Sequence, residues 1–158
     1  MDPIYFRSPW STTLKVSTAV FLALLLLAMI LGGPAGALLG GALLVAAFLM
    51  MVNGYSVQDG KVIVHGLLWH KSFDLCELDD ILAEPYLNNG SVRTFGLGGL
   101  FSSIGYFRNQ ELGNYLGFMT DGQNTVALDF ASKRVLVTPE DPQGFREAVM
   151  AEYHRRRR

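Results

Sequence analysis

The sequence has one cysteine, Cys76, and no charged residue of either sign between Lys15 and Asp59. A single cysteine cannot form a disulfide within the chain, and it argues against a cysteine-based metal centre. One unpaired cysteine also suits a reducing compartment. The three histidines do not follow a metal-ligand spacing either, so we expect no bound metal. They are His65, His70 and His154.

Motifs of nucleotide-dependent and hydrolytic enzymes are also missing. The glycine-rich segment 96–99 superficially resembles a dinucleotide-binding loop. Its third required glycine would fall on position 101, which is Phe101, and no helical pattern follows. The sequence contains no Ser-His-Asp set, Walker loop or nucleophile elbow. We therefore expect no enzyme activity and no cofactor.

Charge is unevenly distributed, although the net charge is only −1. Residues 54–153 carry thirteen acidic and seven basic side chains, whereas the arm before residue 16 has a net charge of +1. An acidic domain argues against nucleic-acid binding, whose affinity comes from basic groups that neutralise phosphates. A part of about 100 residues can bury a core without disulfides or metals.

Two long apolar segments come before this acidic part. Residues 14–33 contain one charge, Lys15, and twenty helical residues span about 30 Å, the thickness of the hydrocarbon layer. After Gly33-Pro34, residues 35–52 add eighteen uncharged positions. The sequence therefore predicts a transmembrane hairpin over residues 14–53. A re-entrant hairpin and a cleaved signal peptide are the alternatives, although the second apolar segment fits a signal peptide poorly.

The residues beside the spans indicate the orientation. The turn 32–36 is uncharged, whereas Arg7 and Lys15 precede the first span. The positive-inside rule then places both termini on the cytoplasmic side of the membrane. Residues 1–13 are predicted to form an interfacial arm because they are rich in aromatic side chains, and residues 4–7 could instead add a strand to the sheet. The aromatic residues are Tyr5, Phe6 and Trp10.

Small residues in the second span are expected to lie at a helix–helix contact. Gly36 and Gly40 form a GxxxG motif, and Gly41 repeats the spacing after Ala37. Glycines four residues apart allow helix backbones to approach closely. The contact could join the two arms of the hairpin or two copies of the chain, or it could bind a ligand.

From residue 54 onward the pattern changes to short strands. Residues 55–57 and 61–65 alternate around Asp59-Gly60, which is a strong signal for a two-residue hairpin. Further strands are expected at 69–75, 81–86, 114–119, 125–130 and 135–137. The segment 138–142 then contains helix-start signals, and the apolar residues that follow have helical spacing: Phe145, Val149 and Tyr153. We expect an α+β fold, with a small antiparallel β-barrel or sandwich closed by one C-terminal helix.

Two further segments suggest a family. The first is the glycine- and aromatic-rich run 94–101, followed by Gly105-Tyr106-Phe107, Leu112-Gly113 and Thr120-Asp121. The second is the segment 137–142 with Phe145. Together they resemble the bacterial pleckstrin-homology-like (PH-like) domains over residues 54–153, and a two-span hairpin before such a domain is common in that family. The resemblance implies a PH-like fold, and most members have no assigned activity.

Two surfaces are candidates for binding. The first is the segment 95–108, which we interpret as a loop that contacts a protein partner or the bilayer. Its candidate residues are Phe95, Leu100, Phe101, Ile104, Tyr106, Phe107 and Arg108. The second is the basic tail 154–158, which could contact anionic lipid or remain a solvated end. Its arginines are Arg155, Arg156, Arg157 and Arg158.

The first predicted hairpin turn, residues 57–61, carries one lysine beside one aspartate. Lipid-binding eukaryotic PH domains concentrate basic residues there, so we expect no phosphoinositide-type site. The leading hypothesis is a non-catalytic, membrane-anchored module that presents a surface to a membrane or cytoplasmic protein, including a second copy of itself. The alternatives are a module that clamps onto lipid headgroups and an accessory subunit of a membrane complex. A 95–108 segment that points toward the hairpin would favour the lipid-facing alternative.

Overall fold

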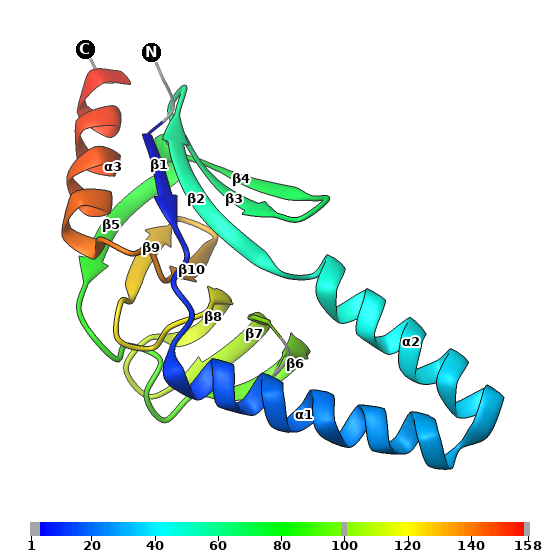
Figure 1. The fold of residues 1–158 in the computed structure, drawn as a ribbon. Helices are drawn as coiled ribbons and strands as arrows, with labels where there is room; N and C mark the ends of the chain where they lie inside the picture. The colour runs from blue at the N-terminus through cyan, green and yellow to red at the C-terminus, as the bar shows by residue number, and fades with distance from the viewer. Residues whose placement is uncertain (1–3, 99–100, 157–158) are drawn as a thin grey trace.

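The computed structural model describes residues 4–98 and 101–156, and Figure 1 shows its fold. Strand β1 (Ile4–Arg7) leads into the helices α1 (Thr12–Leu31) and α2 (Gly33–Leu49). The domain follows, beginning with β2 (Val52–Gln58), β3 (Lys61–Gly66), β4 (His70–Asp74), the 3-10 turn η1 (Leu75–Glu77) and β5 (Leu78–Ala83). It continues with β6 (Val92–Gly98), β7 (Ser103–Asn109), β8 (Gly113–Met119), β9 (Val126–Phe130), β10 (Lys133–Val137) and α3 (Pro142–Arg156).

The helices α1 and α2 form a hairpin that projects away from the domain (Figure 1). The side chain of Ser11 accepts a hydrogen bond from the backbone N–H of Leu14 and so caps α1. The twenty residues of α1 are long and apolar enough to cross a membrane, whereas α2 is apolar but has seventeen residues. It ends three residues before the predicted end of the span because Val52 already pairs with Gly66 in a sheet.

The first sheet contains β1, β2, β3 and β4 in that order, and all its pairs are antiparallel. The expected hairpin at Asp59-Gly60 is confirmed, and both residues have positive φ, 50° and 69°. Residues 4–7 add a strand to the sheet, which was one of the two alternatives for this part of the arm. The strand forms because its backbone pairs with β2 while Phe6 packs edge-on against Phe145 of α3.

The second sheet has six strands in the order β5-β9-β10-β8-β7-β6. Strand β10 is parallel to β8, so the expectation of a wholly antiparallel domain was wrong. The chain makes a hairpin from β9 to β10, and β10 then lies between β9 and β8. Across the described residues, no strand of one sheet pairs with a strand of the other, so the sheets do not form a closed barrel and instead pack as two layers.

The segment 95–108 is not a loop, which corrects the sequence interpretation. It lies within a β-hairpin formed by β6 and β7. The glycines that suggested a loop instead allow a very close approach between the two strands. A Cβ added at Gly105, whose φ is 150°, would lie 2.3 Å from the carbonyl oxygen of Phe95. The strand expected at 81–86 also ends early, because Tyr86 has a φ of 61° and belongs to a turn.

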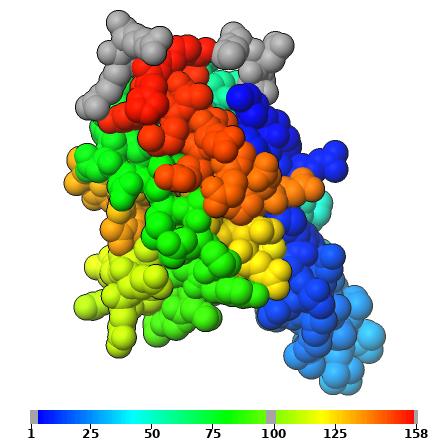
Figure 2. All heavy atoms as spheres, turned by 90° about the vertical axis from the view of Figure 1, so that its left-hand side faces the viewer, coloured from blue at the N-terminus to red at the C-terminus, as the bar shows by residue number. Residues whose placement is uncertain are grey.

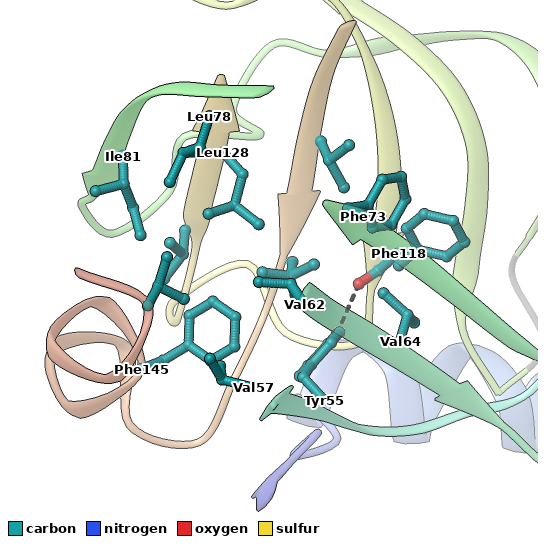
Figure 3. Packing of buried hydrophobic residues seen from close by; sticks show 14 of the residues in the cluster. Tyr55, Val57, Val62, Val64, Phe73, Leu78, Ile81, Phe118, Leu128 and Phe145 are labelled. Carbon is teal, nitrogen blue, oxygen red and sulfur yellow. Dashed lines mark hydrogen bonds between the residues drawn. The ribbon is translucent and has the colours of Figure 1, made fainter. Parts of the chain in front are cut away.

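The main core lies between the two sheets and beneath α3, and Figure 3 shows part of it. Phe145 and Val149 of α3 are fully buried there, together with Tyr55 of β2. Phe73 and Phe118 face each other across the layers, with ring centroids 6.0 Å apart. A smaller cluster, which includes Leu87, Phe107 and Tyr115, covers the other face of the six-stranded sheet.

The helix α3 and the hairpin lie at opposite ends of the domain. In Figure 2, α3 (orange to red) covers the upper part of the face shown, and α1 (blue) emerges at the lower right. The ends of the described chain both lie near the top of Figure 1, away from the turn between α1 and α2. The domain therefore has one end that faces the hairpin and one end that faces away from it.

Candidate interaction surface beside the helical hairpin

The tip of the β6–β7 hairpin lies between the domain-side ends of α1 and α2. The ring of Phe101 lies 5.8 Å from that of Trp10, just before α1, and 5.8 Å from that of Phe48, near the end of α2. Its positive φ of 62° turns the chain at the tip of the hairpin. One aromatic side chain therefore contacts both arms of the helical hairpin.

Two hydrogen bonds strengthen this contact. The backbone N–H of Phe101 donates to the hydroxyl of Thr18 in α1 over 3.4 Å. The hydroxyl of Ser102 donates to the carbonyl oxygen of Met50, just after α2, over 3.0 Å. Thr18 and Ser102 are 4% and 2% exposed. Ser102 is therefore buried against the helices, and Phe101 is half-buried against them.

The seven candidate residues of the 95–108 segment separate into three groups. Phe101 is packed against the helices, Ile104 is half-buried against the main core, and Phe107 is buried in a stack with Tyr115. Phe95, Tyr106 and Arg108 are exposed. Leu100 lies outside the described residues.

The exposed apolar side chains form one strip on β6 and β7. Phe95 and Tyr106 are direct cross-strand partners, and they are 76% and 55% exposed. Val92, which is 67% exposed, pairs with Arg108 further from the tip. Partners directly opposite in a sheet project on the same face. We call Val92, Phe95 and Tyr106 the β6–β7 strip.

The edge of β6 adds main-chain hydrogen-bonding groups to this strip. Among the described residues, β6 pairs with β7 alone and lies at the end of the six-stranded sheet (Figure 1). An unpaired edge strand presents N–H and C=O groups that can bind a further strand. The β6–β7 strip therefore combines exposed apolar side chains with a free strand edge.

A second contact with the hairpin was not found from the sequence. The indole Nε1 of Trp69, after the β3–β4 turn, donates to the carbonyl oxygen of Leu49 at the end of α2 over 2.9 Å. Leu67 and Leu68 occupy the turn itself, and they are 36% and 80% exposed. The one signal in the sequence was a pair of leucines at a hairpin turn, where polar residues and glycine are usual.

Acidic residues are scarce in the two hairpins that approach the helices, and Asp74 at the end of β4, far from the turn, is the one that they contain. The sequence has no Asp or Glu at 60–73, which spans β3 and most of β4, or at 85–110, which spans β6 and β7. Asp121 lies outside these hairpins but near the start of α1. It is only 8% exposed, and its carboxylate accepts hydrogen bonds from Gln123 and Asn124. The end of the domain that faces the helices is thus poorer in negative charge than the rest.

The glycines of α2 differ in their surroundings. A Cβ added at Gly40 would lie 2.4 Å from Cγ of Met29 in α1, and one at Gly36 would lie 3.1 Å from the carbonyl oxygen of Ala28. A Cβ added at Gly41 would meet nothing within 4 Å. Gly36 and Gly40 thus lie at the contact between the two helices, and Gly41 does not.

The arginines at the end of α3 lie at the opposite end of the domain. Arg156 donates to the carboxylate of Asp74 over 2.9 Å and to the carbonyl oxygen of Gly60. A hydrogen bond from the backbone of Cys76, with a smaller contribution from Arg156, lowers the pKa of Asp74. Arg155 pairs with Glu152 over 2.6 Å, and Arg157 and Arg158 lie outside the described residues.

A polar cavity of about 650 Å³ lies between the start of α1 and the loops before β6 and after β8. Its lining includes Ser11, Thr13, Asn88 and Asp121. In the described part of the chain, no group of three or more His, Cys, Asp or Glu residues could hold a metal ion. The cavity therefore offers hydroxyl, amide and carboxylate groups without a cluster of ionisable side chains.

Two packed β-sheets covered by a C-terminal helix make this an α+β domain consistent with the PH-like fold. The model of the bacterial PH domain family matches residues 53–153. Since the match covers well over half of the chain, the protein belongs to the bacterial PH domain family. The match begins inside β2 and ends in α3, so it does not include α1 and α2. No curated protein and no solved structure matches the chain.

Proposed function

We propose that this protein is a non-catalytic PH module anchored in the bacterial inner membrane, and that it binds a protein partner at the membrane surface through the β6–β7 strip. In this proposal α1 and α2 cross the bilayer, and the domain and both termini are cytoplasmic. The observation that carries the proposal is the strip itself, where Phe95 and Tyr106 are exposed side by side next to a free strand edge.

The exposure of the helices supports the membrane anchor. Large apolar side chains are exposed on both helices, including Leu24 at 60%, Ile30 at 77% and Leu38 at 77%. Only Leu14, Thr18 and Leu25 of α1 are buried, together with Gly40 of α2. Exposure of this extent is costly in water and favourable in lipid. The seventeen residues of α2 reach about 26 Å, which a locally thinned bilayer accommodates.

The distance of the strip from the helices favours a protein as its partner. Phe95 lies three residues from Gly98, the last residue of β6, and a strand rises about 3.3 Å per residue. Phe95 is thus about 10 Å from the tip that packs on α1 and α2. This separation from the tip supports a place for the strip at the membrane surface, where an exposed aromatic pair suits a protein partner.

The lipid-clamp alternative rested on the 95–108 segment together with the arginine tail. The tip of β6–β7 does point toward the helices, as that alternative required, but its aromatic ring is used in packing against them. Arg156 is paired with Asp74 at the other end of the domain. We therefore prefer the protein-binding proposal.

The test is site-specific photocrosslinking in cells that express the full-length protein. A photoreactive phenylalanine analogue at position 95 should form an adduct with a distinct protein, and the same analogue at Gln143, exposed on α3, should not. A second substitution, Tyr106→Asp, should abolish the adduct while the protein remains in the membrane fraction. An adduct of equal yield from both positions, or no adduct from position 95, would contradict the proposal.

The anchor requires its own measurement. The protein should remain with membranes after alkaline carbonate washing, which removes peripheral proteins. Cys76 is exposed on the domain, so a membrane-impermeant maleimide should label it only after spheroplasts are opened. Release by carbonate, or labelling of Cys76 in closed spheroplasts, would refute the anchor or the orientation, respectively.

A further inference from the structure

We propose that the β3–β4 turn inserts Leu67 and Leu68 into the bilayer interface beside α2, so that the domain lies on the membrane with one fixed face. The inference rests on the proposed membrane anchor. It adds a third membrane contact to the two helices, and its ligand is the lipid bilayer itself rather than a specific headgroup.

The position of the turn is fixed relative to α2. Trp69 donates its indole N–H to the carbonyl oxygen of Leu49, one of the last carbonyls of the helix, which lacks an intrahelical partner. Val52, three residues after Leu49, pairs with Gly66 at the start of the turn. The turn therefore lies beside the end of α2, and an indole that bridges the two suits the membrane–water interface.

The turn has a conformation that presents its leucines outward. The backbone N–H of Gly66 donates to the carbonyl oxygen of Trp69 over 2.8 Å and closes the turn. The indole of Trp69 occupies the inner side, where a Cβ added at Gly66 would lie 2.1 Å from it. Leu67 and Leu68 are thereby directed away from the core, and 80% of Leu68 is exposed.

The bilayer is the occupant that the surroundings favour. The turn contacts the end of α2, and Phe101 of the β6–β7 hairpin packs on Phe48 of the same helix. If α1 and α2 cross a membrane, both hairpins therefore lie close to its surface. Lys71 and His70 follow the turn, and no acidic residue occurs between Asp59 and Asp74. A hydrophobic tip beside basic side chains is suited to an anionic membrane surface.

The β3–β4 turn and the β6–β7 strip differ in their position relative to the helices. Leu68 lies next to Trp69 in a turn that is bonded to the end of α2, whereas Phe95 is about 10 Å from the end of β6. Insertion of Leu67 and Leu68 into lipid removes from water the apolar surface that no part of the described domain covers. Contact of this kind restricts rotation of the domain about the helices and so holds the strip in a constant direction.

The experiment uses the full-length protein in vesicles of phosphatidylethanolamine and phosphatidylglycerol. In a Cys76→Ser background, single variants Leu68→Cys, Ser72→Cys and Leu24→Cys are labelled with the environment-sensitive fluorophore NBD. Ser72 is exposed on β4, four residues beyond Leu68, and Leu24 is exposed in the middle of α1. Quenching is then measured with lipids that carry a doxyl group near the top of the acyl chain, and separately with lipids that carry it near the end of the chain.

We expect the shallow doxyl group to quench NBD at position 68 by about twofold or more, and the deep doxyl group to quench NBD at position 24 by a similar factor. Neither should quench NBD at position 72 appreciably. Quenching at position 24 without quenching at position 68 would overturn the inference and leave the anchor intact. Absence of quenching at position 24 would refute the proposed anchor itself. Equal quenching at 68 and 72 would also overturn the inference, because it would show general proximity rather than insertion of the turn.

Discussion

The hydroxyl oxygen of Tyr55 lies 2.7 Å from the carbonyl oxygen of Phe118, which is 63 positions further along the chain. This bond joins β2 of the first sheet to β8 of the second and is drawn as a dashed line in Figure 3. The same hydroxyl lies near those of Ser8 and Thr138, and Ser8 lies 2.6 Å from Thr120. Because Ser8 lies between β1 and α1, this network connects the start of the hairpin to both sheets.

Replacement of Tyr55 by Phe should therefore destabilise the whole protein. Tyr55 is completely buried, and burial raises the pKa of its hydroxyl, which remains protonated and able to donate. The variant leaves the carbonyl of Phe118 without this donor, and we expect a loss of about 1–3 kcal/mol in the free energy of unfolding. Urea unfolding in detergent measures this loss. Tyr106→Phe removes an exposed hydroxyl and should have almost no effect; equal losses would show that the network contributes no stability.

A valine at Gly40 should disturb the helical hairpin more than a valine at Gly41. The new side chain at position 40 would collide with Met29, whereas position 41 faces open space. Both variants change the same residue type in the same helix, so propensity effects cancel in the comparison. We expect Gly40→Val to lower the thermal midpoint by several degrees relative to Gly41→Val, as measured by circular dichroism in detergent. Similar midpoints would mean that α1 and α2 do not pack closely through Gly40.

Acidification should destabilise the protein through His65. Burial, together with the nearby charge of His70, lowers the pKa of His65 below its usual 6.5. Between the lowered pKa and 6.5, the unfolded chain binds more protons than the folded chain, so stability rises with pH in this window and falls as the pH drops through it. The side chain also lies 2.7 Å from the Ser56 hydroxyl and beside Tyr5.

The measurement is urea unfolding at pH 5 and pH 7.5 for the native protein and for His65→Gln. The native protein should lose stability at the lower pH, and the variant should lose less. His154→Gln, exposed near the end of α3, serves as the control and should retain the native dependence. If His65→Gln keeps the full pH dependence, another group is responsible for it.

Local sequence signals predicted many of the elements. The Asp59-Gly60 turn, the strands on either side of it and the final helix all follow from patterns that span only a few residues. The glycine-rich segment 95–108 was misread as a loop because glycine is ambiguous in a sequence. Glycines in a sequence usually indicate a turn. Here Gly96 and Gly105 are cross-strand partners, and the absence of side chains at both positions allows β6 and β7 to approach closely.

The sequence predicted which residues of the candidate surface belong together, but not which of them are exposed. The aromatic side chains of 95–108 were recognised as a group, but the sequence could not show which ones face inward. Phe101 packs against Phe48, more than fifty positions earlier, while Phe95 remains exposed. Neither the contact between Trp69 and Leu49 nor the pairing of Arg156 with Asp74 has a local pattern that would indicate it.

The sequence by itself determined the apolar hairpin, the alternating strands and the acidic character of the domain, because hydropathy, periodicity and charge are properties of neighbouring residues. Only the tertiary structure decided that β10 lies parallel to β8, that β1 joins the first sheet, and that the β3–β4 and β6–β7 hairpins contact the ends of α1 and α2. These features depend on contacts between distant segments. Such contacts form only when the two sheets bury a common core, and they decide which apolar side chains remain exposed.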